Sequence, residues 1–259
     1  MKMSSTIKLL GIPLTLYDRA GLLTAVHNRI QTRQKTIILS GNVHSFNLAY
    51  ETEWLRDFFN RADIVRLDGA GVRLGAKLLG VDTPSRMTWA DFAWDLAQFC
   101  AQNQYTLYFL GAKPGIAPKA AQKLQSQYPD LHFAGIQHGY FDKEKGSAEN
   151  TAVLHQINAA QPHILVVGFG MPLQEKWLSQ NLHDINVPVI MTAGAAFDYI
   201  SGELQRGPAW MTNNGLEWLA RLLIEPRRLW RRYIIGNPLF LWRILKQRFG
   251  LLKLNQTHS

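Results

Sequence analysis

The chain has 259 residues, 47% of them hydrophobic, and a formal net charge of +9. It can bury a full core, and its length fits one large α/β domain or a domain with an appendage. The single cysteine, Cys100, excludes an intramolecular disulfide and is expected in the core, which fits a reducing cytoplasm. The chain has no run of about 18 apolar residues, so we expect no transmembrane helix. It also has no long apolar segment near the N-terminus, so we expect no signal peptide.

The positive charge is concentrated at the C-terminal end. From Arg221 onward there are nine basic residues and one acid, Glu225, which gives +8 and leaves +1 for residues 1–220. A basic terminal segment on a nearly neutral body indicates an anionic partner for that segment.

The first elements place polar residues after a buried strand. Leu9–Leu16 reads as one or two short strands, and Asp18 can cap a helix that runs to about Arg33. A strand at 36–39 is followed by a small polar segment in which Asn42 and His44 are candidate ligand contacts, although a structural role is favoured for His44 alone.

The next strand ends in an aspartate. A helical stretch over 43–61 leads to a strand at 63–67, and Asp68-Gly-Ala-Gly-Val72 then enters a helix over 72–79. The two glycines that follow this strand-end aspartate allow close approach of a ligand, whereas a plain capped turn is the structural alternative. Arg86 precedes a predicted helix cap at Thr88, where a guanidinium could hold a phosphate or form a surface ion pair.

Glycine loops follow two further strands. A strand at 105–110 precedes the segment Gly111–Gly115, but neither a P-loop nor a Gly-x-Gly-x-x-Gly fingerprint is present. A strand at 131–136 precedes Tyr140 and Phe141, an aromatic pair that could flank a base or belong to the core.

The stretch 164–177 combines a buried strand with a polar helix start. Ile164–Val167 is short and β-branched, which favours a strand covered on both faces. Gly168 and Gly170 then permit close backbone approach, and Gln174 and Glu175 follow on the first helical turn. An ordinary turn requires neither of these side chains, so the pair favours a ligand site at the carboxyl edge of a sheet.

Strands and helices alternate to about residue 200, which predicts a parallel sheet wrapped by helices. From residue 213 the pattern is helical only, with Pro226 and Pro238 expected to break it. We therefore divide the chain into an α/β domain, 1–208, and a basic amphipathic helical appendage, 209–259. Arginines interleaved with aromatic and aliphatic residues favour a membrane surface; packing or an oligomer contact, and then nucleic acid, are the alternatives.

An ordered set of motifs resembles the WecG/TagA/CpsF family of bacterial glycosyltransferases. The motifs are Asp68-Gly-x-Gly71, Phe109-Leu-Gly111, Gly168-x-Gly-x-Pro-x-Gln-Glu-x-Trp177, Gly202, Arg206-x-Pro208, Glu217-Trp218, and Glu225-Pro226 to Arg232-Tyr233.

The resemblance implies a Rossmann-like parallel sheet flanked by helices, with a C-terminal helical appendage that associates with the membrane. It implies inverting transfer of a sugar, often of the N-acetylmannosamine type, from a UDP-sugar to a polyprenyl-diphosphate-linked acceptor sugar in surface polysaccharide or cell-wall polymer synthesis. The expected location is peripheral, on the cytoplasmic face of the membrane. Neither a cofactor, a metal nor a nucleic-acid partner is implied, a homo-oligomer is possible, and a non-catalytic nucleotide- or lipid-binding module is the alternative.

The resemblance also assigns roles to residues. Asp68 is the candidate general base. The candidate substrate-binding residues are Asn42, Arg86, Gly111, Gly168, Gln174, Glu175, Arg206, Arg228, Arg231 and Arg232, with the arginines at 206 and in the tail neutralising diphosphate charge. One position departs from the family, since Trp89 stands where glycine is usual.

Overall fold

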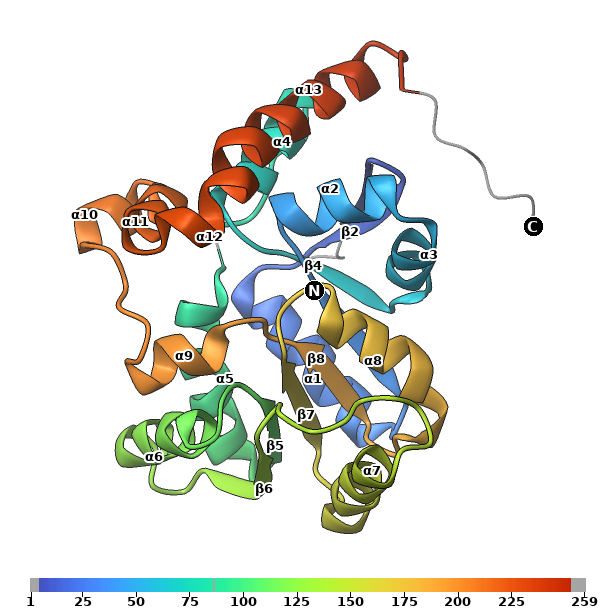
Figure 1. The fold of residues 1–259 in the computed structure, drawn as a ribbon, viewed down its shortest axis with the longest axis vertical. Coiled ribbons are helices and arrows are strands. Elements are labelled where there is room, and N and C mark those ends of the chain that lie inside the picture. Colours follow the sequence, from blue (N-terminus) through green and yellow to red (C-terminus); the bar gives the residue numbers. More distant parts are fainter. Residues whose placement is uncertain (1–4, 86, 253–259) are drawn as a thin grey trace.

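A computed structural model describes residues 5–85 and 87–252. Its centre is an eight-stranded sheet in which all neighbouring pairs are parallel except the first, β1 with β2 (Figure 1). In spatial order the strands are β1 (Ser5–Leu9), β2 (Ile12–Leu16), β4 (Ile64–Leu67), β3 (Thr36–Gly41), β8 (Val189–Thr192), β7 (Ile164–Gly168), β5 (Thr106–Gly111) and β6 (His132–Gln137). The predicted α/β fold with a parallel sheet is confirmed, with an antiparallel hairpin added at one edge.

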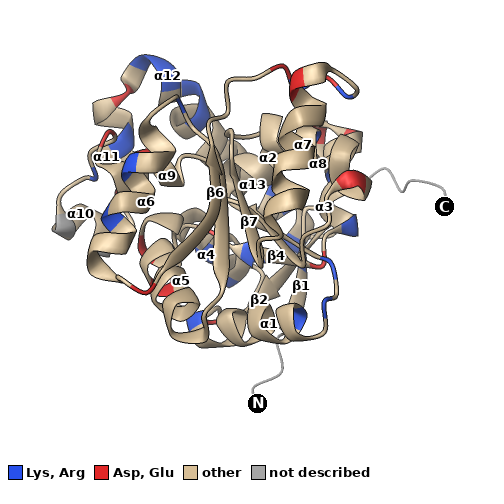
Figure 2. Ribbon diagram, turned by 90° about the horizontal axis from the view of Figure 1, so that it is seen from below, with Lys and Arg blue, Asp and Glu red and all other residues tan. Residues whose placement is uncertain are grey.

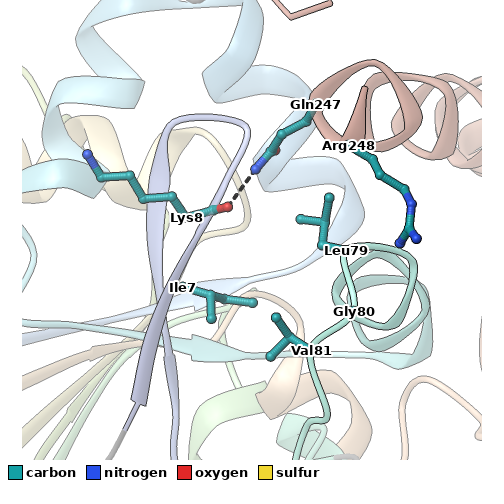
Figure 3. A pocket seen from close by; sticks show the side chains of 7 residues that line it. All are labelled: Ile7, Lys8, Leu79, Gly80, Val81, Gln247 and Arg248. Carbon is teal, nitrogen blue, oxygen red and sulfur yellow. Dashed lines mark hydrogen bonds between the residues drawn. The ribbon is translucent and has the colours of Figure 1, made fainter. Parts of the chain in front are cut away.

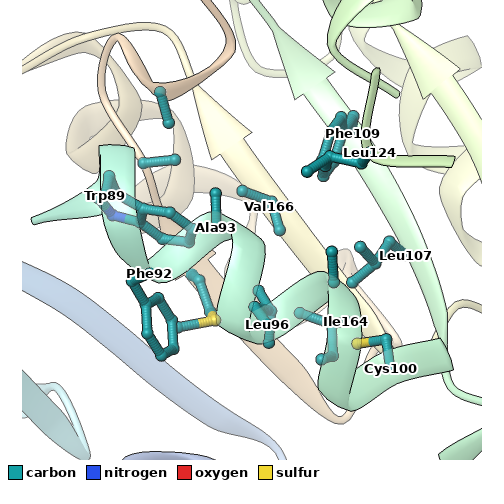
Figure 4. Packing of buried hydrophobic residues seen from close by; sticks show 14 of the residues in the cluster. Trp89, Phe92, Ala93, Leu96, Cys100, Leu107, Phe109, Leu124, Ile164 and Val166 are labelled. Atoms are coloured by element: carbon teal, nitrogen blue, oxygen red, sulfur yellow. The ribbon is translucent and has the colours of Figure 1, made fainter. Parts of the chain in front are cut away.

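Helices cover both faces of the sheet, and each face has its own apolar cluster. One cluster contains residues of α1 (Arg19–Gln31), α5 (Trp89–Asn103), α6 (Ile116–Gln127) and α9 (Ala196–Ser201). The other contains residues of α2 (Val43–Glu51), α3 (Glu53–Arg61), α4 (Ala70–Leu78), α7 (Ala148–Ala160) and α8 (Leu173–Asn181), and a 3-10 turn, η1 (Leu182–Asp184), follows α8. Figure 4 shows part of the first cluster, in which Cys100 is a buried core residue as expected.

The predicted helix over 43–61 is two helices. Thr52 lies between them in an extended conformation (φ −122°, ψ 109°), so α2 ends there and α3 begins. The apolar spacing continues through both helices because both face the same cluster. Helix α2 contributes Phe46 to it, and α3 contributes Leu55 and Phe59.

The C-terminal segment is helical, as predicted. It comprises α10 (Ala209–Asn213), α11 (Glu217–Ile224), α12 (Pro226–Trp230), a π-helical turn η2 (Arg231–Ile235) and α13 (Gly236–Arg248). Pro226 opens α12, but Pro238 lies in the first turn of α13 and does not break the run, because that turn needs no amide hydrogen from it. In the described part of the chain, no helix has the length and apolarity needed to span a membrane.

The last helix is attached to the body. Phe240 and Ile244 of α13 are fully buried in the cluster that contains α2 and α4. Near its end, the Gln247 side-chain amide donates to the Lys8 carbonyl (2.7 Å) and accepts from the Leu10 amide (2.8 Å), beside a hollow formed with the end of α4 (Figure 3).

Candidate functional site

The segments that follow the parallel strands lie side by side at one edge of the sheet. The Asp68 amide donates to the Gly41 carbonyl (2.9 Å), the Ala112 amide to Gly168 (3.0 Å) and the Ala193 amide to Val167 (2.8 Å). Strand pairing therefore extends into the loops, and Asn42, Asp68, Gly111 and Gly168 share the carboxyl edge, where α/β proteins bind ligands.

Asp68 lies at the end of β4, directly before Gly69, whose φ is +94°. Its side chain is 18% exposed, and an oxygen lies 3.6 Å from a guanidinium nitrogen of Arg66. A second cation, Arg232 of η2, also interacts electrostatically with Asp68. The carboxylate predicted as a base is thus accessible at the sheet edge and sits in a positive field.

Arg66 was not predicted as a site residue. It occupies the interior of β4 and is 1% exposed, a position where the sequence pattern favours only apolar side chains. The one available signal was the charge itself, because an arginine inside a buried strand requires a partner.

Trp89, the departure from the family, points into the core. Figure 4 shows its side chain beside Phe92 and Ala93 in the apolar cluster. The side chain is 7% exposed, and its indole nitrogen donates to Ser40 Oγ (3.0 Å) and to the Thr192 carbonyl (2.7 Å). Its bulk therefore fills the space beneath the sheet edge and joins β3 to β8.

Asn42 caps helix α2. Its Oδ1 accepts from the Ser45 amide (3.0 Å) while Ser45 Oγ accepts from the Asn42 amide (2.8 Å), a reciprocal capping box. The adjacent His44 is partly buried, and burial, followed by the charge of Arg232, lowers its pKa to about 4. His44 is therefore neutral near neutral pH.

Gln174 and Glu175 are enclosed by protein. Gln174 Oε1 accepts from the Gly194 amide (3.0 Å), and its Nε2 donates to Glu175 Oε1 (2.8 Å). Burial raises the pKa of Glu175 to about 7. This pair acts on the sheet edge through Gly194, whose amide it holds in place.

A cavity of about 720 Å³ opens over the ends of β5, β6, β7 and β8. Its wall includes Gly168, Phe169 and Gly170 after β7, and Gly194 after β8. Gly111 directly precedes Ala112 of the wall, and a Cβ there would meet the Gly168 carbonyl oxygen at 2.3 Å, so the close approach of the two loops requires glycine at 111.

The cavity carries charges of both signs and aromatic rings. Lys113, Lys143 and Arg228 line it together with Asp198 and the 63%-exposed Tyr140. The Lys143 ammonium lies 4.5 Å from the centre of the Phe141 ring and 4.8 Å from that of Phe169, and burial lowers its pKa. Sequence reasoning noted Tyr140 and Phe141 but missed both lysines, which come from the loops before α6 and α7, and Asp198 of α9.

The predicted arginines occupy different surroundings. Arg228 lines the cavity and pairs with Glu225 at 2.7 Å; Arg231 is exposed and stacks on Trp230, and Arg232 is partly buried. Arg206 forms two hydrogen bonds with Asp91 (2.7 and 3.0 Å) and so ties the segment before α10 to α5. Arg86 lies outside the described residues.

Comparison with known proteins identifies the family. The model for "Glycosyl transferase WecG/TagA/CpsF family" matches residues 7–254. The chain belongs to this family. A Bacillus subtilis (strain 168) relative, named N-acetylglucosaminyldiphosphoundecaprenol N-acetyl-beta-D-mannosaminyltransferase, is 30% identical over 74% of this chain and 73% of its own. A Staphylococcus aureus (strain NCTC 8325 / PS 47) relative of the same name is 25% identical over 96% of both chains.

The resemblance inferred from the motifs is thereby confirmed, and the chain is a glycosyltransferase by family. The carboxyl edge of the sheet holds a strand-end carboxylate, Asp68, and a cavity lined by cations and aromatic rings.

Proposed function

We propose that this glycosyltransferase moves a sugar, with N-acetylmannosamine favoured, from a UDP-sugar to a polyprenyl-diphosphate-linked acceptor sugar, with inversion. The carrying observation is that Asp68 and the charged cavity share one sheet edge. Two to five strand spacings, about 10 to 24 Å, separate β4 from the strands under the cavity, and a diphosphate with its sugar can bridge the nearer part of that range. The names of the two relatives support the sugar and the acceptor.

The cavity is suited to the nucleoside diphosphate. Tyr140 and Phe169 offer ring faces to a base, and the Asp198 carboxylate can accept from ribose hydroxyls. Lys113, Lys143 and Arg228 supply positive charge for two phosphates. Because Lys143 is partly buried, solvent screens its charge less than that of an exposed lysine.

Asp68 is suited to the proton transfer. As the acceptor hydroxyl oxygen forms a bond to the anomeric carbon, the carboxylate takes its proton, and UDP leaves from the opposite face with the bonding electrons. Attack opposite to the leaving group inverts the anomeric centre. Arg232 and Arg228 neutralise the charge that develops on the departing diphosphate.

The C-terminal segment is suited to the membrane that holds such an acceptor. Large apolar side chains are exposed there, namely Trp210, Leu223, Ile224, Trp230, Ile234, Ile235, Trp242 and Phe249. Basic residues occur in the same segment, at 227 and 228 in α12 and at 231 and 232 in η2, and Figure 2 shows the basic positions at α12 in blue. Apolar anchors with interspersed arginines favour the anionic, cytoplasmic face of a bilayer, with peripheral attachment.

The two halves of the site can be tested separately. We expect Asp68→Asn to lower transfer from UDP-N-acetylmannosamine to a lipid-linked acceptor at least roughly 100-fold while UDP binding, measured by calorimetry, is retained. We expect Lys143→Met to weaken UDP binding roughly tenfold through the loss of a charged contact.

Lys145→Met, an exposed lysine in the same loop, is the control for Lys143. Full transfer by Asp68→Asn would contradict the assignment of the base. UDP binding by the wild-type protein without transfer from any UDP-sugar would favour a non-catalytic nucleotide-binding module.

A further inference from the structure

Arg66 is a fully buried cation directly behind the proposed base. It is 1% exposed and lies two residues before Asp68 on β4. Removing a guanidinium from water is costly, so its contacts must compensate for lost hydration. An arginine in a buried strand therefore indicates a specific structural or functional role.

Three kinds of contact fix the guanidinium in one place. Its Nε donates to Ser40 Oγ (3.2 Å), and its Nη1 donates to the Met87 carbonyl (3.0 Å). The group also lies 5.0 Å from the centre of the Trp89 ring and 5.5 Å from that of Phe92. Ser40 lies in β3, Met87 lies just before α5, and both rings belong to α5. Several elements therefore determine the position of the charge.

The remaining nitrogen, Nη2, faces Asp68. It lies 3.6 Å from Asp68 Oδ2 and has no hydrogen-bond partner among the described residues. At this separation in a poorly solvated site, the attraction between opposite charges is substantial. Burial lowers the pKa of Arg66 and the charge of Asp68 opposes that effect, so each group favours the ionised form of the other.

We propose that Arg66 is a positioning residue for the reaction, which holds the Asp68 carboxylate ionised and oriented from the side opposite to the substrate. This inference rests on the proposed role of Asp68. The charged groups that face Asp68 include Arg232 from η2, with His44 of α2 beside that arginine. Arg66 differs from Arg232 because it is anchored in the body of the protein, independently of the C-terminal segment.

The pH dependence of kcat/KM separates positioning from simple support of the fold. In Arg66→Gln we expect the acid-side fall of kcat/KM to move upward by about 1 to 3 pH units, because an opposite charge near the carboxylate has been removed. Arg66→Lys should return this limb toward its wild-type position. UDP affinity should be unchanged in both variants, since Arg66 does not line the cavity.

Trp89→Phe is the matched structural control. It removes the indole hydrogen bonds to Ser40 and Thr192 but keeps an aromatic ring beside the Arg66 guanidinium and removes no charge, so it should lower the melting temperature without moving the acid-side fall of kcat/KM. An unmoved limb in folded Arg66→Gln would overturn the proposal, as would an equal shift in Trp89→Phe.

A reciprocal measurement does not require any change to the buried arginine. The side-chain nitrogen resonances of Arg66, followed by NMR, should shift in Asp68→Asn and stay in place in Asp198→Asn, a carboxylate of the cavity. Unchanged Arg66 resonances in Asp68→Asn would overturn the pairing even if Arg66→Gln failed to fold. Full sugar transfer by Asp68→Asn would instead contradict the proposed function, so the two failures are distinguishable.

Discussion

The two oxygens of the Glu175 carboxyl group have unequal surroundings. Oε1 accepts from Gln174, whereas Oε2 is buried and has no hydrogen-bond partner among the described residues. A buried carboxyl with a free oxygen favours its protonated form, and burial raises the pKa of Glu175 to about 7 from an ordinary 4.5. Ionising this group in the folded state is therefore costly, although its link through Gln174 shapes the Gly194 loop.

This arrangement predicts a pH-dependent gain from Glu175→Gln. Between pH 4.5 and about 7 the folded protein holds a proton that the unfolded chain has released, so stability falls as pH rises through that window. Glutamine does not titrate and can still accept from Gln174. The variant should be more stable than the wild type at about pH 8, by up to roughly 3 kcal/mol, and the gain should shrink toward about pH 5.

Urea denaturation of both proteins across this pH range measures the difference. Glu144→Gln, at an exposed position in the loop before α7, is the control. A stability difference between Glu175→Gln and wild type that is independent of pH would contradict the prediction.

At the scale of elements, the packing of two loops sets the floor of the cavity. Gly111 has φ +152° and lies against the backbone of Gly168. A Cβ atom at position 111 would lie 2.3 Å from the Gly168 carbonyl oxygen. A side chain there must displace backbone rather than a flexible neighbour. The loops after β5 and β7 are thus fixed relative to each other at the place where the cavity begins.

We expect Gly111→Ala to lower the free energy of unfolding by at least about 2 kcal/mol and to weaken UDP binding, since Gly168 lines the cavity. Gly115→Ala is the matched control, because Gly115 also has a positive φ, +85°, but open space around its Cβ position. Denaturation and UDP titration measure both effects. Equal losses in the two variants would show that backbone conformation, rather than the contact with Gly168, determines the cost.

The sequence predicted where strands end but not which loops meet. Small and polar residues after buried strands correctly indicated segments that lie together at one edge of the sheet, because parallel strands all present their carboxyl ends there. The break at Thr52 was missed because apolar spacing continues across it. Lys143 and Arg66 were missed because their partners, Phe169 and Trp89, are distant in sequence, and periodicity carries no information on such contacts.

At the scale of the whole molecule, the C-terminal segment is attached to the α/β body through α13 and exposes apolar side chains on its other helices. Arg243 of α13 pairs with Glu51 (2.5 Å) and donates to Asn47 Oδ1 (3.0 Å), while α11, α12 and η2 present exposed apolar residues. Because α13 is fixed to the α/β domain, contact of these exposed side chains with a bilayer would hold the whole molecule at the membrane.

We therefore expect Trp230→Ser to weaken binding to vesicles of anionic phospholipid roughly tenfold, which corresponds to about 1.4 kcal/mol. Trp54→Ser is the control, since Trp54 of α3 has a similar exposure, 39% against 45%, outside the C-terminal segment. Flotation of the full-length proteins with vesicles measures the difference. Equal binding by the two variants would contradict a membrane contact through α12.

The order of strands in the sheet also bears on how the molecule is made. Strands β1 to β4 come from residues 5–67 and can pair as soon as they emerge, whereas β5 to β8 come from residues 106–192. Within the sheet the halves join at β3 and β8, where Ser40 and Thr192, 152 positions apart, exchange hydrogen bonds. During synthesis Asp68 is thus made well before the residues of the cavity, and the first half must keep an open strand edge until the second half is made.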